Sequence, residues 1–142
     1  MFKVIKKMEF CYGHRLMAHS GPCKHLHGHN ARVELELAAE NLNPQGMVRD
    51  FLEIKQVMQT WLDRTFDHRM LLQEGDPLID VLKKADEPVG VVGYPPTAEN
   101  LAREIFSYAQ TAGLPIKEVR IWETQNSLAS YCGDKNNHKD SD

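Results

Sequence analysis

The chain has 142 residues, which suits one domain large enough to bury a hydrophobic core. Its net charge is −3 with both signs intermixed, so no basic stripe indicates nucleic acid and no basic amphipathic helix indicates a membrane surface. The apolar runs are too short to span a bilayer, and "MFKVIKKMEF" lacks the apolar core of a signal peptide. Three cysteines are too few for a disulfide framework. We therefore expect a cytoplasmic protein.

The first half of the chain predicts two strands and a helix. Alternation of apolar and polar residues predicts one strand over 2–10 and a second over 27–37, with His27 and His29 on the apolar face of the second. A turn follows at 43–46. Apolar residues at helical spacing then predict a helix over 51–65, which Asp50 and Glu53 open as a capping pair.

The second half predicts a helix and a closing hairpin. A short helix at 78–84 and an extended piece at "VGVV" precede a helix that Thr97 caps and Gly113 ends. Strands over 116–124 and 127–132 follow. The order indicates an α+β fold, ββααββ, with two helices on one face of a four-stranded antiparallel sheet. We expect one domain over 1–133 and a disordered tail over 134–142.

Histidines cluster near the start of the second strand. His27 and His29 are two residues apart on a strand, so their rings share a face and lie roughly 7 Å apart at the backbone. Two imidazoles placed in this way can bind one ion, and zinc is the usual metal for an all-imidazole site. His14, just beyond the first strand, is the best-placed third ligand. His19 and His25 are expected to be solvated loop residues.

Cys23 leaves two zinc hypotheses open. As a fourth ligand it would close a Cys–His₃ site, which would then be structural. As a free thiol beside an open His₃ site it would be an acid–base group, because a nearby cation favours the thiolate.

Two further positions carry carboxylates of interest. Asp67 directly precedes His68, and a carboxylate can orient an imidazole for proton transfer. Glu123 shares a strand face with Val119 and Ile121, where it needs either an internal arginine or a ligand with two adjacent N–H groups.

Six segments together resemble the pyruvoyl-tetrahydropterin synthase family of tunnelling-fold enzymes. They are "FCYGHRL", "CKHLHGHN", "GMVRDF", "FDHRMLL", "PTAENLA" and "VRIWET", in the family's order, and the resemblance covers residues 2–132.

The resemblance implies a zinc enzyme that acts on a pterin triphosphate, with the following roles. Zinc is bound by His14, His27 and His29; Cys23 is the proton-transfer base; Asp67 and His68 form the partner relay; Glu123 holds the pterin ring. It also implies that sheets join into a barrel in a homo-oligomer, a hexamer built as a dimer of trimers, with active sites between subunits. Such an oligomer would also cover the open sheet edges.

Within the family, the Cys23-to-His27 spacing resembles the bacterial 6-carboxytetrahydropterin synthases of queuosine biosynthesis. This implies 7,8-dihydroneopterin triphosphate as substrate, with 6-carboxytetrahydropterin, acetaldehyde and triphosphate as products. Three residues depart from the usual pattern: Ala31 replaces an aromatic, Phe66 a leucine and Leu72 an asparagine. The alternatives are a 6-pyruvoyltetrahydropterin synthase, a paralogue that cleaves dihydroneopterin, and a zinc-stabilised binding module without catalysis.

Overall fold

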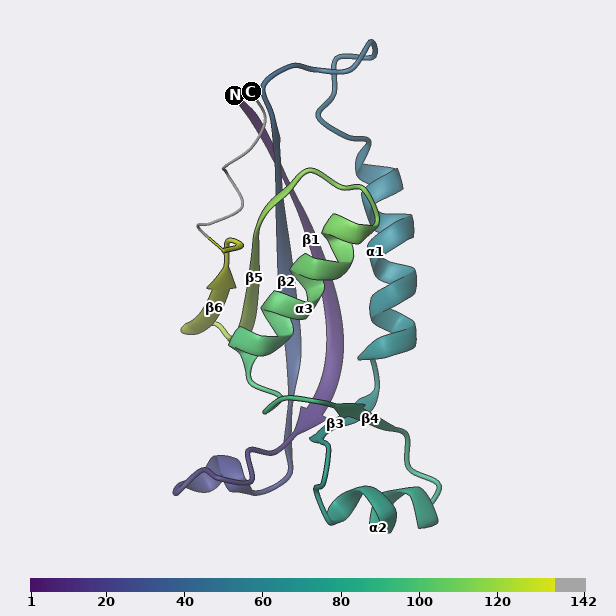
Figure 1. Ribbon diagram of the computed structural model, residues 1–142, viewed down its shortest axis with the longest axis vertical. Coiled ribbons are helices and arrows are strands. Elements are labelled where there is room, and N and C mark those ends of the chain that lie inside the picture. The colour runs from purple at the N-terminus through teal and green to yellow at the C-terminus, as the bar shows by residue number, and fades with distance from the viewer. Residues whose placement is uncertain (135–142) are drawn as a thin grey trace.

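The computed structural model describes residues 1–134 (Figure 1). Its elements, in chain order, are β1 (Phe2–His14), a 3₁₀ turn (Pro22–Lys24), β2 (His27–Ala39), α1 (Phe51–Thr65), β3 (Arg69–Gln73), α2 (Leu78–Lys84), β4 (Val89–Val92), α3 (Ala98–Thr111), β5 (Ile116–Thr124) and β6 (Ser127–Tyr131). No helix among these is long and apolar enough to cross a membrane. The tail predicted over 134–142 lies, apart from Asp134, outside the described residues.

The strands form one sheet in the order β4-β3-β1-β2-β5-β6. The four strands predicted from sequence pair antiparallel, β1 with β2, β2 with β5 and β5 with β6, and β6 forms one edge of the sheet. The expected α+β fold is therefore confirmed, but the sheet has six strands and the described chain three helices. β3 and β4 extend the sheet beyond β1 with parallel pairing, and α2 connects them. β4 coincides with the extended piece predicted at "VGVV", and α2 with the short helix predicted at 78–84. β3 was not predicted, because a five-residue strand is too short for its alternation to stand out in the sequence.

α1 and α3 cover one face of the sheet and form the core with it. The buried side chains of β1, β2 and β5 on this face include Phe10, Val33 and Ile121. The two helices contact each other through Trp61 and Tyr108, whose rings stack with centroids 4.4 Å apart. Asp50 caps α1 by accepting from the Leu52 amide, and Thr97 caps α3 by accepting from the Asn100 amide, as expected for these side chains.

Candidate metal centre and acid–base pair

The pairing of β1 with β2 brings the three predicted histidine ligands together. β1 continues to His14, four residues past the predicted end of the strand, and its register sets His14 opposite His27 and Tyr12 opposite His29. Because residues two apart share a strand face, all three imidazoles project toward the helices. Their ring centroids lie 4.5, 5.1 and 5.2 Å apart.

Gly28 permits this close approach of the two strands. A Cβ atom at this position would lie 2.9 Å from the Tyr12 carbonyl oxygen, which belongs to the backbone and has no freedom to move aside. Any larger residue would push β2 away from β1 and separate the histidines. The close spacing of β1 and β2 therefore requires a glycine between the two histidines of "HGH".

Backbone carbonyls fix the proton positions on two of the rings. Nδ1 of His14 lies 2.6 Å from the Pro96 oxygen, and Nδ1 of His27 lies 2.8 Å from the His25 oxygen. A carbonyl can only accept, so each Nδ1 carries its hydrogen, and each neutral ring presents the lone pair of Nε2. Metal-binding histidines are commonly oriented by such a second hydrogen bond.

The donor atoms fit a metal ion. One nitrogen from each of His14, His27 and His29 lies within 4.8 Å of the others. Nε2 of His14 and Nε2 of His29 are buried and have no hydrogen-bond partner in the described part of the chain, an arrangement that costs free energy unless a ligand is present. Burial lowers the pKa of His14, which favours the neutral form that binds metal, although its hydrogen bond to Pro96 acts in the opposite direction.

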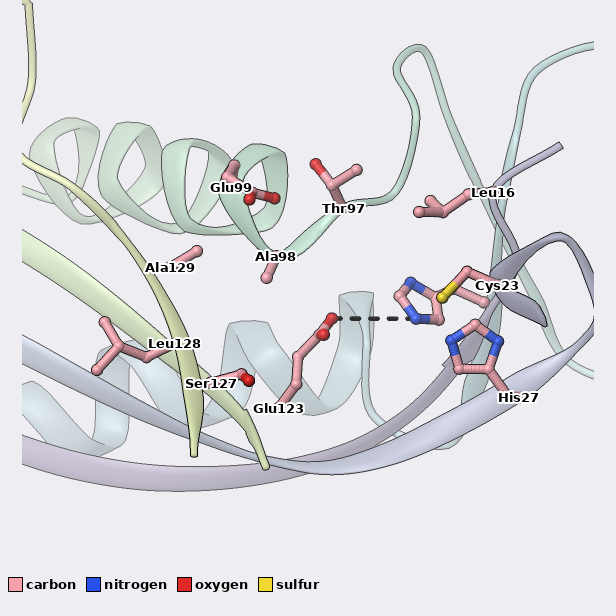
Figure 2. Close-up of a pocket in the computed structure, with 11 residues that line it drawn as sticks. Leu16, Cys23, His27, Thr97, Ala98, Glu99, Glu123, Ser127, Leu128 and Ala129 are labelled. Atoms are coloured by element: carbon pink, nitrogen blue, oxygen red, sulfur yellow. Dashed lines mark ion pairs between the residues drawn. The ribbon is translucent and has the colours of Figure 1, made fainter. Parts of the chain in front are cut away.

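A cavity of about 310 Å³ opens beside the histidines (Figure 2). The residues lining it come from β1, the loop after it, β2, α3, β5 and β6: His14, Leu16, Cys23, His27, Thr97, Ala98, Glu99, Glu123, Ser127, Leu128 and Ala129. Cys23 and His27 lie at one end, Leu128 and Ala129 at the other, and Glu123 projects from β5 between them. Two of the predicted ligands, the thiol and the predicted pterin-binding carboxylate thus share one cavity.

The loop between β1 and β2 places Cys23 at this cavity. Cys23 lies in the 3₁₀ turn Pro22–Lys24, and its carbonyl accepts a hydrogen bond from the Leu16 amide at 2.9 Å, so the turn folds back on the end of β1. Among the described residues, the group of candidate ligands within 4.8 Å contains the three histidines but not Cys23. This geometry fits the open-site hypothesis better than the closed Cys–His₃ site.

Glu123 receives a hydrogen bond that the sequence did not indicate. The Tyr12 hydroxyl donates to Glu123 Oε1 at 2.7 Å, instead of an arginine. The Glu123 side chain keeps 24% of its surface exposed, so it is accessible from the cavity. Its oxygens lie 3.9 Å from His14 Nε2 and 3.8 Å from His29 Nε2.

Asp67 and His68 form the expected pair on the edge of β1. Asp67 Oδ2 accepts from His68 Nδ1 at 2.7 Å, and its Oδ1 accepts from the Cys11 amide at 2.9 Å. His68 adopts a left-handed backbone with φ of 54°, uncommon outside glycine, and its amide donates to the Cys11 carbonyl. Burial acts to raise the pKa of Asp67, but the hydrogen bonds from Cys11 and His68 hold it below the ordinary value of 3.8. The carboxylate therefore orients the imidazole, and the outer nitrogen of the ring is free to exchange a proton.

The structure does not bring this pair together with Cys23 in one cavity. His68 is 79% exposed and lines a second cavity of about 560 Å³, between β1, β3 and α2. His27 lines both cavities, but Cys23 and Glu123 line only the first of these two. In a single chain the thiol and the acid–base pair thus face different spaces.

Several residues near the site were not predicted from the sequence. Tyr12 lies two residues before His14 on the same face, so its position beside the ligands could have been found from the strand period. Glu99 lines the first cavity from the start of α3. Arg15 forms a bidentate ion pair with Asp76, a contact between distant segments that left no local signal. The three departures from the family pattern, Ala31, Phe66 and Leu72, are fully buried and line neither cavity.

Comparison with known proteins gives a consistent result. A model of the family described as 6-pyruvoyl tetrahydropterin synthase matches residues 3–134. The chain is 35% identical to a 6-carboxy-5,6,7,8-tetrahydropterin synthase from Rickettsia bellii, over 89% of this chain and 96% of that one. It is 29% identical to the enzyme of the same name from Haemophilus influenzae, over 92% and 99% of the two chains.

Solved structures show the same fold. An uncharacterized protein from Wolinella succinogenes superposes with a TM-score of 0.77 at 24% identity, over 94% of this chain and 98% of that one. The 6-pyruvoyl tetrahydropterin synthase of Caenorhabditis elegans superposes with a TM-score of 0.68 at 26% identity, over 94% and 96%.

Proposed function

The chain belongs to the 6-pyruvoyl tetrahydropterin synthase family, and we propose that it is a zinc-dependent lyase of the 6-carboxytetrahydropterin type. It would convert 7,8-dihydroneopterin triphosphate and one water into 6-carboxy-5,6,7,8-tetrahydropterin, acetaldehyde and triphosphate, in the pathway to queuosine. The relatives that bear this name over most of their length support the product assignment. The reducing cytoplasm would keep Cys23 a free thiol.

The observation that carries the proposal is the composition of the first cavity. Two of the three histidines with oriented or unpartnered nitrogens, a thiol and a carboxylate all line the same space of about 310 Å³. A three-histidine site with an open fourth position is typical of catalytic rather than structural zinc.

Each residue of the cavity has a defined task in this proposal. Glu123 would accept hydrogen bonds from the pterin amino group and the adjacent ring N–H, for which a carboxylate is a well-matched acceptor. Zinc, when bound to His14, His27 and His29, would supply a Lewis acid for the side-chain oxygens. Cys23, at the end of the cavity next to His27, would take a proton from the side-chain carbons.

A second copy of the chain would complete the site. His68 lines a different cavity from Cys23 in one chain, and its side chain is largely exposed. An exposed, oriented imidazole on the outside of a subunit can reach substrate bound at a neighbouring subunit. We therefore propose a homo-oligomer, a hexamer of two trimers, in which His68 of one copy serves the cavity of the next.

Product analysis tests the proposal. Purified protein incubated with zinc and 7,8-dihydroneopterin triphosphate should release acetaldehyde in an amount equal to the pterin consumed, together with triphosphate. Triphosphate without acetaldehyde would indicate a 6-pyruvoyltetrahydropterin synthase, and a two-carbon hydroxyaldehyde would indicate a paralogue that cleaves dihydroneopterin.

A thiol variant separates catalysis from a structural zinc site. Cys23→Ala should keep its zinc and lose about 10²–10⁴-fold in turnover, the usual contribution of a general acid–base group. Cys132→Ala, which changes an exposed thiol outside the cavity, should behave as the unmodified protein. Loss of zinc and unfolding in Cys23→Ala would instead support the zinc-stabilised binding module.

A further inference from the structure

Tyr12 occupies an unusual position between the histidines and Glu123. Its side chain is almost completely buried, with 1% of its surface exposed, and its ring lies 5.0 Å from that of His14 and 5.6 Å from that of His29. The only polar atom of this side chain is the hydroxyl, which donates to Glu123 Oε1. Because a carboxylate oxygen can only accept, the hydroxyl is the donor in this 2.7 Å hydrogen bond.

The hydrogen bond leaves Glu123 near the histidines but outside the set of candidate ligands. Its oxygens lie 3.9 Å from His14 Nε2 and 3.8 Å from His29 Nε2. Among the described residues, however, the group of donor atoms within 4.8 Å of one another contains the three histidines and not Glu123. Carboxylates are ordinary zinc ligands beside histidine, so a freely rotating Glu123 would compete for the fourth position of a three-histidine site. Some contact must therefore restrain it.

We propose that Tyr12 is a positioning residue whose hydroxyl holds Glu123 off the metal and toward the pterin. The inference rests on the proposed function and adds a residue to it. A carboxylate has about four acceptor sites, so the bond from Tyr12 leaves enough of them for the two N–H groups of a pterin. Tyr12 thereby keeps the fourth metal position open for substrate and orients the acceptor that binds the pterin ring.

The first test is the affinity for neopterin, an unreactive pterin that lacks the triphosphate. Tyr12→Phe keeps the ring and its packing but removes the donor, so neopterin binding to the zinc-loaded protein should weaken about 10-fold or more, as expected for a hydrogen bond to a charged group. In the Glu123→Gln background the same change should add almost nothing, because the partner of the hydroxyl is already altered.

The outcomes separate this inference from the proposed function. If Glu123→Gln weakens neopterin binding and Tyr12→Phe does not, the positioning role is wrong and the pterin role of Glu123 stands. If Glu123→Gln has no effect, the pterin role of Glu123 fails, and the inference fails with it. A lower melting temperature for Tyr12→Phe with unchanged neopterin affinity would mean that the hydroxyl serves the fold alone, which overturns the inference.

Cobalt in place of zinc gives a second readout that does not involve pterin binding. The visible spectrum of the cobalt protein reports the ligands of the metal. Glu123→Gln should leave this spectrum unchanged while Tyr12 is present and should change it in the Tyr12→Phe background, where the carboxylate is free to bind. A spectrum that already changes in the single variant Glu123→Gln would show that Glu123 is a ligand, and this overturns the inference without any need for Tyr12→Phe.

Tyr94→Phe is the matched control. The Tyr94 hydroxyl is also buried but has no hydrogen-bond partner in the part of the chain that the structure describes. Tyr94→Phe therefore removes a buried hydroxyl, as Tyr12→Phe does, but at a residue that lines neither of the two cavities. Neopterin affinity and the cobalt spectrum should both remain as in the unmodified protein.

Discussion

The candidate metal centre (His14, His27 and His29) and the candidate acid–base pair (Asp67 and His68) differ in how they are held and in how exposed they are. His14 is buried with 2% of its surface exposed, and the ladder of β1 and β2 sets the place of all three histidines. His68 is 79% exposed and lies on a connection between α1 and β3. The Cys11 backbone holds the pair: its amide donates to Asp67 Oδ1, and its carbonyl accepts from the His68 amide. The three histidines therefore have their partners within one chain, whereas the His68 ring is exposed at the surface of the chain.

Under the proposed function, the two regions have different tasks. A metal site requires several donors at fixed distances, and a strand pair inside one chain supplies them rigidly. A proton-transfer group needs only one oriented ring with access to the substrate. The metal centre should therefore be a property of the folded chain, and turnover a property of the assembly.

Loss of a histidine ligand should have the largest effect. In His27→Ala, one of three ligands is removed, so zinc affinity should fall by more than about 100-fold and the purified protein should contain almost no zinc. Turnover should disappear with the metal. Metal analysis of the purified variant measures its zinc content, and acetaldehyde release measures its turnover.

His25→Ala is the control for this variant. The His25 side chain is exposed, and the residue contacts the site only through its backbone carbonyl, which remains after the substitution. Its zinc content should be unchanged. Full zinc occupancy in His27→Ala would contradict the assignment of the histidines.

Removal of the exposed imidazole should have a smaller effect and leave the metal in place. His68→Ala should retain zinc and lose about 10²–10⁴-fold in turnover. If neighbouring copies share the site, a mixture of His68→Ala and Cys23→Ala chains that are unfolded and refolded together should recover about a quarter of the activity, since random assembly of a symmetric oligomer gives that fraction of intact pairs. A mixture that stays as inactive as its components would show that each chain uses its own His68.

The positions of the three histidines and of Glu123 could be predicted because they follow from the alternation of neighbouring residues along one strand. His27 and His29 share a strand face by period alone, and Glu123 shares a face with buried residues of β5 in the same way. The place of His14 was right, although β1 proved longer than expected and includes it. The buried face of β1 continues through Tyr12 to His14, but the glycine between them is typical of a turn and ended the predicted strand early.

The contacts between distant segments could not be predicted from the periodicity of apolar residues along the chain. Nothing near Tyr12 in the sequence points to Glu123, 111 residues away, and nothing near Arg15 points to Asp76. β4 was predicted only as an extended piece, and its parallel pairing with β3, across a connection that contains α2, left no local signal. These features follow from how elements pack, which a single sequence does not reveal.

The ion pair of Arg15 and Asp76 connects the two regions, and its loss should have the smallest effect. Arg15 follows the candidate ligand His14, and Asp76 follows β3, which begins next to His68 in the sequence. Nε of Arg15 donates to Asp76 Oδ2 at 2.8 Å, and the Asp76 side chain is 1% exposed. Asp76→Asn keeps an oxygen for the Leu78 amide but removes the charge, so the free energy of unfolding should fall by about 1.5–3 kcal/mol while zinc is retained.

The pH dependence of this loss identifies its cause. The Arg15 guanidinium holds the pKa of Asp76 below its ordinary value of 3.8, so the folded state binds the proton of this carboxyl less readily than the unfolded state. The stabilisation by the ion pair is then fully present above pH 3.8 and decreases as the pH falls through the lower pKa of the folded state.

Denaturant unfolding should show a constant difference in the free energy of unfolding between the unmodified protein and Asp76→Asn near neutral pH, and a smaller difference in acid. Asp50→Asn, which changes an exposed cap without an ion pair to arginine, should show little difference at any pH. A difference for Asp76→Asn that persists unchanged in acid would mean that the side chain acts through its shape and not through its charge.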